Sequence, residues 1–301
     1  MKNLFLEERA STVIFFSFIL IGLLGVIGIV MDGGTLFVTK AHLQKTANAV
    51  VLSAAQELLN DEEDVITVSD KILDAHNEKS SLHQLNIELG NKISIHLKKE
   101  VSLSFLRLFG FPSAPVEATS TAALGLMGRA KGAAPLGIDD SIQLEFYKEY
   151  KLKVDQTEVD AGNFGILALD GPGAKTYEQN LRDGYSGEIE IGTIIETQTG
   201  NIAGKTRIVI NERINACPHP PGDISHRDCS RILLIPVYKP YDYTSNQLKK
   251  IEITGFAYFY ILEPMNAQDT SVTGMFIEKT GNGFTDPNGT NTGAYSIKLT
   301  K

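Results

Sequence analysis

The stretch VIFFSFILIGLLGVIGIVMDGGTLFVTKAHLQ, residues 13–44, decides the fold, because a long apolar run ends within it at a single aspartate. No residue from Ala10 to Met31 is charged. The core of the run, Val13–Met31, would span about 28 Å as a helix, which is close to the hydrocarbon thickness of a bilayer. The apolar part of a secretory signal covers only about 7–15 residues, so the run predicts an uncleaved membrane anchor.

The residues that end the run predict where the membrane stops. An aspartate is costly at the centre of a bilayer and tolerated at its boundary, so Asp32 marks the outer edge of the predicted span. Gly33 and Gly34 would each cost about 1 kcal/mol against alanine in a helix, which makes this point a candidate for a bend.

Three glycines inside the run form a second pattern. Gly22, Gly25 and Gly28 recur at every third position. They could form a small-residue stripe on which another membrane helix packs, or they could reflect the ordinary frequency of glycine in membrane helices.

Beyond the boundary, an apolar stripe predicts an amphipathic stalk helix over 32–60. Its members recur at spacings of three, four and seven: Leu36, Leu43, Ala47, Val50, Ala54 and Leu58. Asn60-Asp61 is a suitable stop, and a single helix from Val13 to Leu59 would be about 70 Å long.

The rest of the chain favours strands. Residues 61–127 read as a short helix followed by alternating half-buried strands, and 128–137 reads as a flexible linker. We expect 138–301 to form a β-rich domain, with candidate strands at 142–147, 187–196, 206–214, 231–238, 251–262 and 294–300. The predicted fold class is therefore α+β: one transmembrane helix, a helical stalk and a mainly antiparallel domain outside the membrane.

Charge bears on partners and on orientation. Lys and Arg number 28 against 36 Asp and Glu, a net charge of −8, which argues against a nucleic-acid partner. The positive-inside rule does not decide the orientation, because each side of the span carries two basic residues: Lys2 and Arg9 before it, and Lys40 and Lys45 after it. A short segment 1–12 and a long remainder favour a cytoplasmic N-terminus and an exported domain.

The two cysteines lie in one loop, CPHPPGDISHRDC, residues 217–229. Their closeness predicts a disulfide between Cys217 and Cys229, as an exported domain allows. The alternative is a zinc site that adds His219 and His226, but the spacing matches no familiar finger pattern. We predict the disulfide and no metal.

No pattern in the sequence predicts catalysis. The glycine-rich stretch GNFGILALDGPGAKTY, residues 162–177, lacks the spacing of a phosphate loop, and Asp170-Gly171-Pro172-Gly173 reads as a tight turn. Neither a G-x-S-x-G elbow nor an H-E-x-x-H motif is present. We therefore expect a protein that is not an enzyme and needs no cofactor.

The N-terminal third resembles a known family. IGIVMDGGTLFVTKAHLQKTANAVVLSAAQEL, residues 27–58, is similar to the signature of TadE/TadG-like proteins of bacterial Tad (Flp) pilus-assembly systems. The matching positions are Asp32, Gly34, Phe37, Lys40, Leu43, Gln44, Ala47, Ala49, Ala54 and Ala55. The resemblance continues more weakly through FLRLFGF, residues 105–111, and into the C-terminal half.

This resemblance implies a single-pass protein of the bacterial cytoplasmic membrane that serves pilus assembly or anchoring without catalysis. Its implied partners are the lipid bilayer and other Tad membrane proteins or pilin-like subunits, met through the transmembrane and stalk helix. One alternative is a minor pilin-like subunit built into the fibre. Another, of a different class, is an anchored ligand-binding or hydrolytic domain that uses the 162–175 turn or the cysteine loop.

Overall fold

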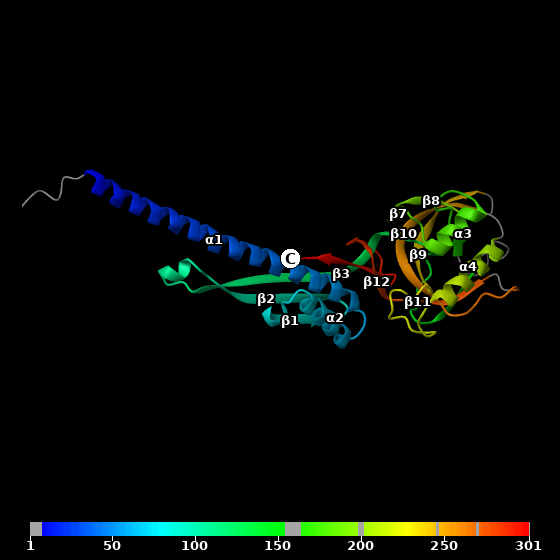
Figure 1. Ribbon diagram of the computed structural model, residues 1–301. Coiled ribbons are helices and arrows are strands. Elements are labelled where there is room, and N and C mark those ends of the chain that lie inside the picture. The colour runs from blue at the N-terminus through cyan, green and yellow to red at the C-terminus, as the bar shows by residue number, and fades with distance from the viewer. Residues whose placement is uncertain (1–7, 154–163, 198–201, 245–246, 269–270, 301) are drawn as a thin grey trace, which may run out of the picture.

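A computed structural model describes residues 8–153, 164–197, 202–244, 247–268 and 271–300 of the chain. It confirms the predicted fold class: a long apolar helix precedes a β-rich region, with 34% helix and 37% strand overall. The molecule is elongated, with a helix and a narrow sheet side by side and a rounder body, here called the head, at the far end (Figure 1).

Helix α1 (Glu8–Ala54) is continuous and passes into a short 3-10 helix, η1 (Ala55–Glu57). It runs through Gly33 and Gly34 without interruption, so the two glycines do not break the helix. Large apolar side chains of the first half, from Val13 to Met31, are 48–69% exposed. This helix is long and apolar enough to cross a membrane.

The second half of α1 is amphipathic, as its apolar stripe predicted, and that stripe packs on a sheet of the same chain. Leu43, Ala47, Val50, Ala54 and Leu58 are all buried. They form one core with helix α2 (Glu62–Ala75) and with strands β1 (Leu82–Glu88), β2 (Lys92–Ser102) and β3 (Ser113–Lys131). The side chain of Asp61 caps α2 by accepting the amide of Asp64 at 2.9 Å. We call α1 from residue 32, α2 and this sheet the stalk.

A buried carboxylate ties the parts of the stalk together. Glu78 precedes the 3-10 helix η2 (Lys79–Ser81) and accepts hydrogen bonds from Lys99 Nζ and Ser81 Oγ, each at 2.5 Å. His42 Nε2 of α1 lies 3.5 Å away. Burial alone would raise the pKa of Glu78, but the hydrogen bonds from Lys99 and Ser81 outweigh it, and the pKa is lowered. The charged group therefore joins α1, β2 and η2.

The C-terminal strands return to the stalk sheet. Among the described strands this sheet has the order β1-β2-β3-β14-β12, and β13 and β7 also pair with β3. These added strands are short: β7 (Glu188–Glu190), β12 (Lys279–Gly281), β13 (Gly283–Thr285) and β14 (Ala294–Leu299). The chain end therefore lies against the stalk, as Figure 1 shows.

The head is a second sheet covered by two helices. Its described strands follow the order β5-β11-β10-β9-β4-β6, and β8 pairs with β10. Their bounds are β4 (Leu136–Asp139), β5 (Glu149–Lys153), β6 (Phe164–Ile166), β8 (Ile194–Glu196), β9 (Ile232–Thr244), β10 (Gln247–Ile261) and β11 (Ser271–Ile277). Helices α3 (Ala174–Asp183) and α4 (Ala203–Ala216) meet through a hydrogen bond between the Tyr177 and Thr206 hydroxyls at 2.9 Å.

Several segments differ from what their sequence pattern predicted. Residues 206–214 lie in helix α4, so the predicted strand is wrong; its buried residues, Thr206, Val209, Ile210 and Ile214, follow the helical period. The strand predicted at 142–147 is also wrong: this segment is irregular and ends in a turn before β5. In the segment 128–137, where a linker is expected, the first four residues end β3, the last two begin β4, and most of the segment is buried.

Candidate membrane-boundary site

Asp32 is the centre of the site. Its side chain is buried, with 4% of the residue exposed. One carboxylate oxygen accepts the amide of Ser104 at 2.9 Å, and the other accepts those of Phe105 at 2.9 Å and Leu106 at 2.7 Å. These amides belong to the hairpin loop 103–112 between β2 and β3, which we call the tip loop. The 3-10 helix η3 (Leu106–Phe109) begins there.

The electrostatics of this contact favour the ionised carboxylate. The amide of Leu106 contributes most to lowering the pKa of Asp32, and the amides of Ser104 and Phe105 act in the same direction. Burial acts the other way but is outweighed, so the pKa lies below its ordinary value. A charged group thus fixes the tip loop to α1 at the end of the apolar run.

Gly28 completes the attachment one turn further into the run. A Cβ atom built on Gly28 would lie 2.6 Å from the Phe105 ring, so only glycine leaves room for this side chain. Gly22 and Gly25 have no such neighbour within 4 Å among the described residues. The predicted small-residue stripe is therefore covered at Gly28 by the chain itself and open at the other two positions.

The other motif residues divide between the two sides of α1. Leu43 and Ala47 lie in the stalk core, and Gln44 Nε2 donates to the Thr119 carbonyl of β3 at 2.9 Å. Phe37 is 75% exposed, and a side chain at Gly34 would meet open space. The motif thus combines a face that binds the sheet with a face that the chain leaves uncovered.

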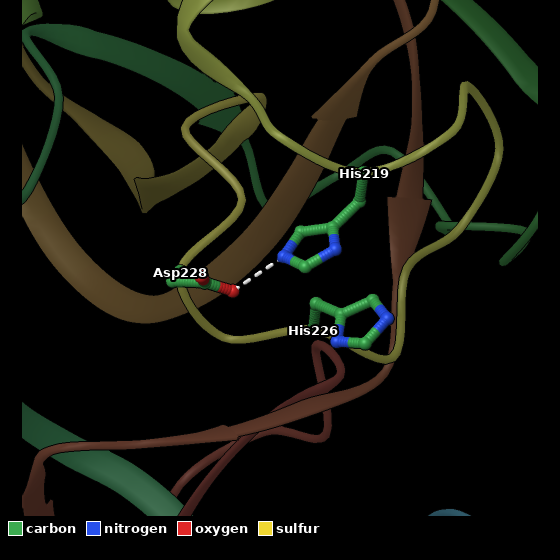
Figure 2. Close-up of side chains that lie close together, drawn as sticks. All are labelled: His219, His226 and Asp228. Carbon is green, nitrogen blue, oxygen red and sulfur yellow. Dashed lines mark hydrogen bonds and ion pairs between the residues drawn. The ribbon is translucent and has the colours of Figure 1, made fainter.

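The cysteine loop lies at the opposite end of the stalk. Cys217 and Cys229 form the predicted disulfide, which removes their thiolates from any zinc site. The His219 and His226 rings are stacked, with their centroids 3.6 Å apart, and His219 Nε2 is hydrogen-bonded to Asp228 Oδ1 at 2.7 Å; Figure 2 shows the three side chains together. The ligand atoms of these three residues lie within 4.8 Å of one another, so they could hold a divalent transition metal with water completing its coordination.

The same loop contacts η1, which continues α1. Arg227 Nη2 donates to the Gln56 carbonyl at 2.9 Å, and Thr280 Oγ1 donates to the same oxygen at 2.8 Å. Arg227 also pairs with Glu57 at 3.6 Å. Burial lowers the pKa of Arg227, and Glu57 opposes that shift. A cation at the C-terminal end of a helix satisfies free carbonyls and complements the helix dipole. We call the contacts of Arg227 with Gln56 and Glu57 the stalk–head joint; Thr280 belongs to β12 of the stalk sheet.

Sequence reasoning located Asp32 but missed what it binds. The tip loop and Arg227 were not singled out as functional, since their partners lie far away in the chain. The one signal for the tip loop was FLRLFGF itself, whose apolar residues follow no strand period.

Fold and site together define a class: a β-rich body on a helical stalk whose apolar extension is suited to a membrane. Residues 10–57 match the model of the Tad family, Flp pilus-assembly TadE/G-like proteins. The resemblance predicted from 27–58 is thereby confirmed for this N-terminal part of the chain. A comparison with curated proteins and one with solved structures found no match.

Proposed function

We propose that this protein is a single-pass, non-enzymatic component of a bacterial Tad (Flp-type) pilus system that assists assembly or anchoring. Residues 13–31 cross the cytoplasmic membrane, 1–12 face the cytoplasm, and the stalk and the β-rich region lie outside. Partner membrane proteins or pilin-like subunits bind along the transmembrane and stalk helix.

One observation carries the proposal: the family match covers the segment in which the exposed apolar helix becomes the stalk. The charged Asp32 stands at that transition, where a boundary residue is expected. The disulfide supports an exported head, because such bonds persist in oxidising compartments.

Complementation tests the proposal. Deletion of the gene from a strain that carries Tad genes should abolish or sharply reduce surface pili counted by electron microscopy, and the full chain should restore them. An Asp170→Ala variant, altered at an exposed turn of the head, should restore them equally well. Normal piliation in the deletion strain would refute the pilus role. If the Asp170→Ala variant is produced as a stable protein but does not restore pili, a ligand-binding or hydrolytic head is favoured.

Two further measurements resolve the finer points. Protease added to intact cells with a permeable outer layer should digest the head and spare the N-terminus. Shearing should leave the protein with the cells; its recovery in the sheared fraction would instead identify a fibre subunit.

A further inference from the structure

The tip loop exposes a cluster of large apolar side chains. Phe105, Leu108, Phe109 and Phe111 are 40%, 82%, 66% and 62% exposed. Soluble surfaces rarely expose a contiguous apolar group of this kind unless it contacts a partner or a membrane. The chain places it at the end of a hairpin, where the loop closes on itself through the bond from the Phe111 amide to the Leu106 carbonyl at 3.1 Å.

The position of the cluster along α1 identifies what it meets. Asp32 holds three successive tip-loop amides, and Phe105 covers Gly28. Gly28 lies three residues inside the end of the predicted span, which corresponds to about 4.5 Å along a helix. The tip loop is therefore fixed at the depth at which the apolar surface of α1 ends.

The cluster is also chemically continuous with that surface. The large side chains of α1 from Val13 to Met31 are exposed and apolar, and the tip loop extends this apolar surface sideways. Arg107 is the basic residue of η3 and is exposed, as a group that meets lipid phosphates would be. Burying such side chains at the interface is favourable because it removes apolar area from water.

We propose that the tip loop inserts into the outer interface of the bilayer, so that the stalk sheet contacts the membrane at a second point beside α1. This inference rests on the proposed membrane span, which sets the depth of Gly28 and Asp32. The bilayer, and not a partner protein, is the occupant, because the apolar cluster is held level with the lipid-facing part of its own anchor.

Depth-dependent fluorescence quenching tests the insertion. The chain contains no tryptophan, so one introduced residue reports alone. Phe109→Trp probes the tip loop, Ile21→Trp the middle of the span and Tyr241→Trp an exposed strand position in the head. Each full-length variant is reconstituted in vesicles whose lipids carry bromine either near the headgroup or deep in the acyl chain, after thermal unfolding confirms that it folds like the unsubstituted protein.

We expect Phe109→Trp to be quenched several-fold more than Tyr241→Trp, and more by the shallow bromines than by the deep ones. Ile21→Trp should show the opposite depth preference. If Ile21→Trp is quenched while Phe109→Trp behaves like Tyr241→Trp, the proposed insertion of the tip loop is wrong and the proposed membrane span is supported. If neither Ile21→Trp nor Phe109→Trp is quenched, the proposed membrane span is also wrong. A blue-shifted but unquenched Phe109→Trp would show protein cover and overturn the proposal.

Discussion

The carboxylate of Asp32 has two roles in the N-terminal part of this molecule. Asp32 follows the last residue of the apolar run in α1. Its carboxylate also accepts hydrogen bonds from the amides of Ser104, Phe105 and Leu106, which lie more than seventy residues further along the chain. Several hydrogen bonds to one ionised acceptor are individually stronger than neutral ones, and they favour the charged form of that acceptor. A conservative substitution at this position therefore removes the charge without removing the shape.

We predict that Asp32→Asn loosens the tip loop while α1 stays helical. Amide exchange at Ser104, Phe105 and Leu106 should become several-fold faster, measured by hydrogen exchange on the full chain in detergent micelles. Asp61→Asn is the matched control, because it removes an equal charge from the cap of α2. Unchanged exchange at the three amides in Asp32→Asn would refute the assigned role.

The pH dependence follows from the same contact. The pKa of Asp32 is lowered from 3.8 in the folded protein. The stabilisation that the charged carboxylate gives to the tip-loop contact is therefore fully present above pH 3.8, and it is lost as the pH falls through the lower pKa of the folded state. The amide shifts of the tip loop should therefore titrate below 3.8 in the native chain and not in the variant.

At the scale of elements, the disulfide restrains the loop 217–229, which contains no helix or strand of its own. The bond joins Cys217, at the end of α4, to Cys229, which precedes β9. Between them, the amide of Gly222 donates to the Tyr260 hydroxyl at 2.9 Å, and Arg227 reaches the stalk. The loop thus depends on its closure to present Arg227.

We predict that replacing both Cys217 and Cys229 by serine lowers the free energy of unfolding of the head by about 2–3 kcal/mol, the usual contribution of a short disulfide loop. Guanidinium denaturation followed by tyrosine fluorescence measures the change. Reductant should lower the stability of the unsubstituted chain to the same extent and leave the double variant unaffected. An unchanged denaturation midpoint in the double variant would contradict the prediction.

The elements also show how far sequence patterns reach. The apolar run and the stripe through Leu43 and Ala47 predicted α1 correctly, because helical periodicity is a local property. Residues 206–214 were misread because a short apolar run fits a strand or a helix equally well. Neither the return of β14 to β3 nor the contact of Asp32 with the tip loop is encoded locally, since each joins segments that the sequence keeps far apart.

At the scale of the whole molecule, the stalk–head joint links η1 to the head beside an apolar core that both parts share. The Gln56 carbonyl accepts from both Arg227 and Thr280, so a single oxygen of η1 receives contacts from two segments of the chain. The chain also crosses between stalk and head after β3, on both sides of β7 and between β11 and β12, and these crossings limit how far the head can turn.

We predict that Arg227→Ala widens the range of stalk–head orientations without unfolding either part. Spin labels at Lys71→Cys on α2 and Tyr241→Cys on β9 should show a distance distribution broadened by several ångströms in double electron–electron resonance. Arg207→Ala, which removes an arginine of α4, is the control. An equally narrow distribution in Arg227→Ala would show that the chain crossings and the shared apolar core fix the head without Arg227.

The antiparallel pairing of β2 with β3 has a mechanical consequence. The pairing runs from Lys92 opposite Ala123 to Ser102 opposite Ser113, along the axis that joins the head to α1. A pull on the head against an anchored α1 would slide β3 lengthwise past β2, and the hydrogen bonds between the strands lie perpendicular to that pull. Such shear loads the bonds together instead of opening them one by one, so the sheet resists a lengthwise pull between the head and α1.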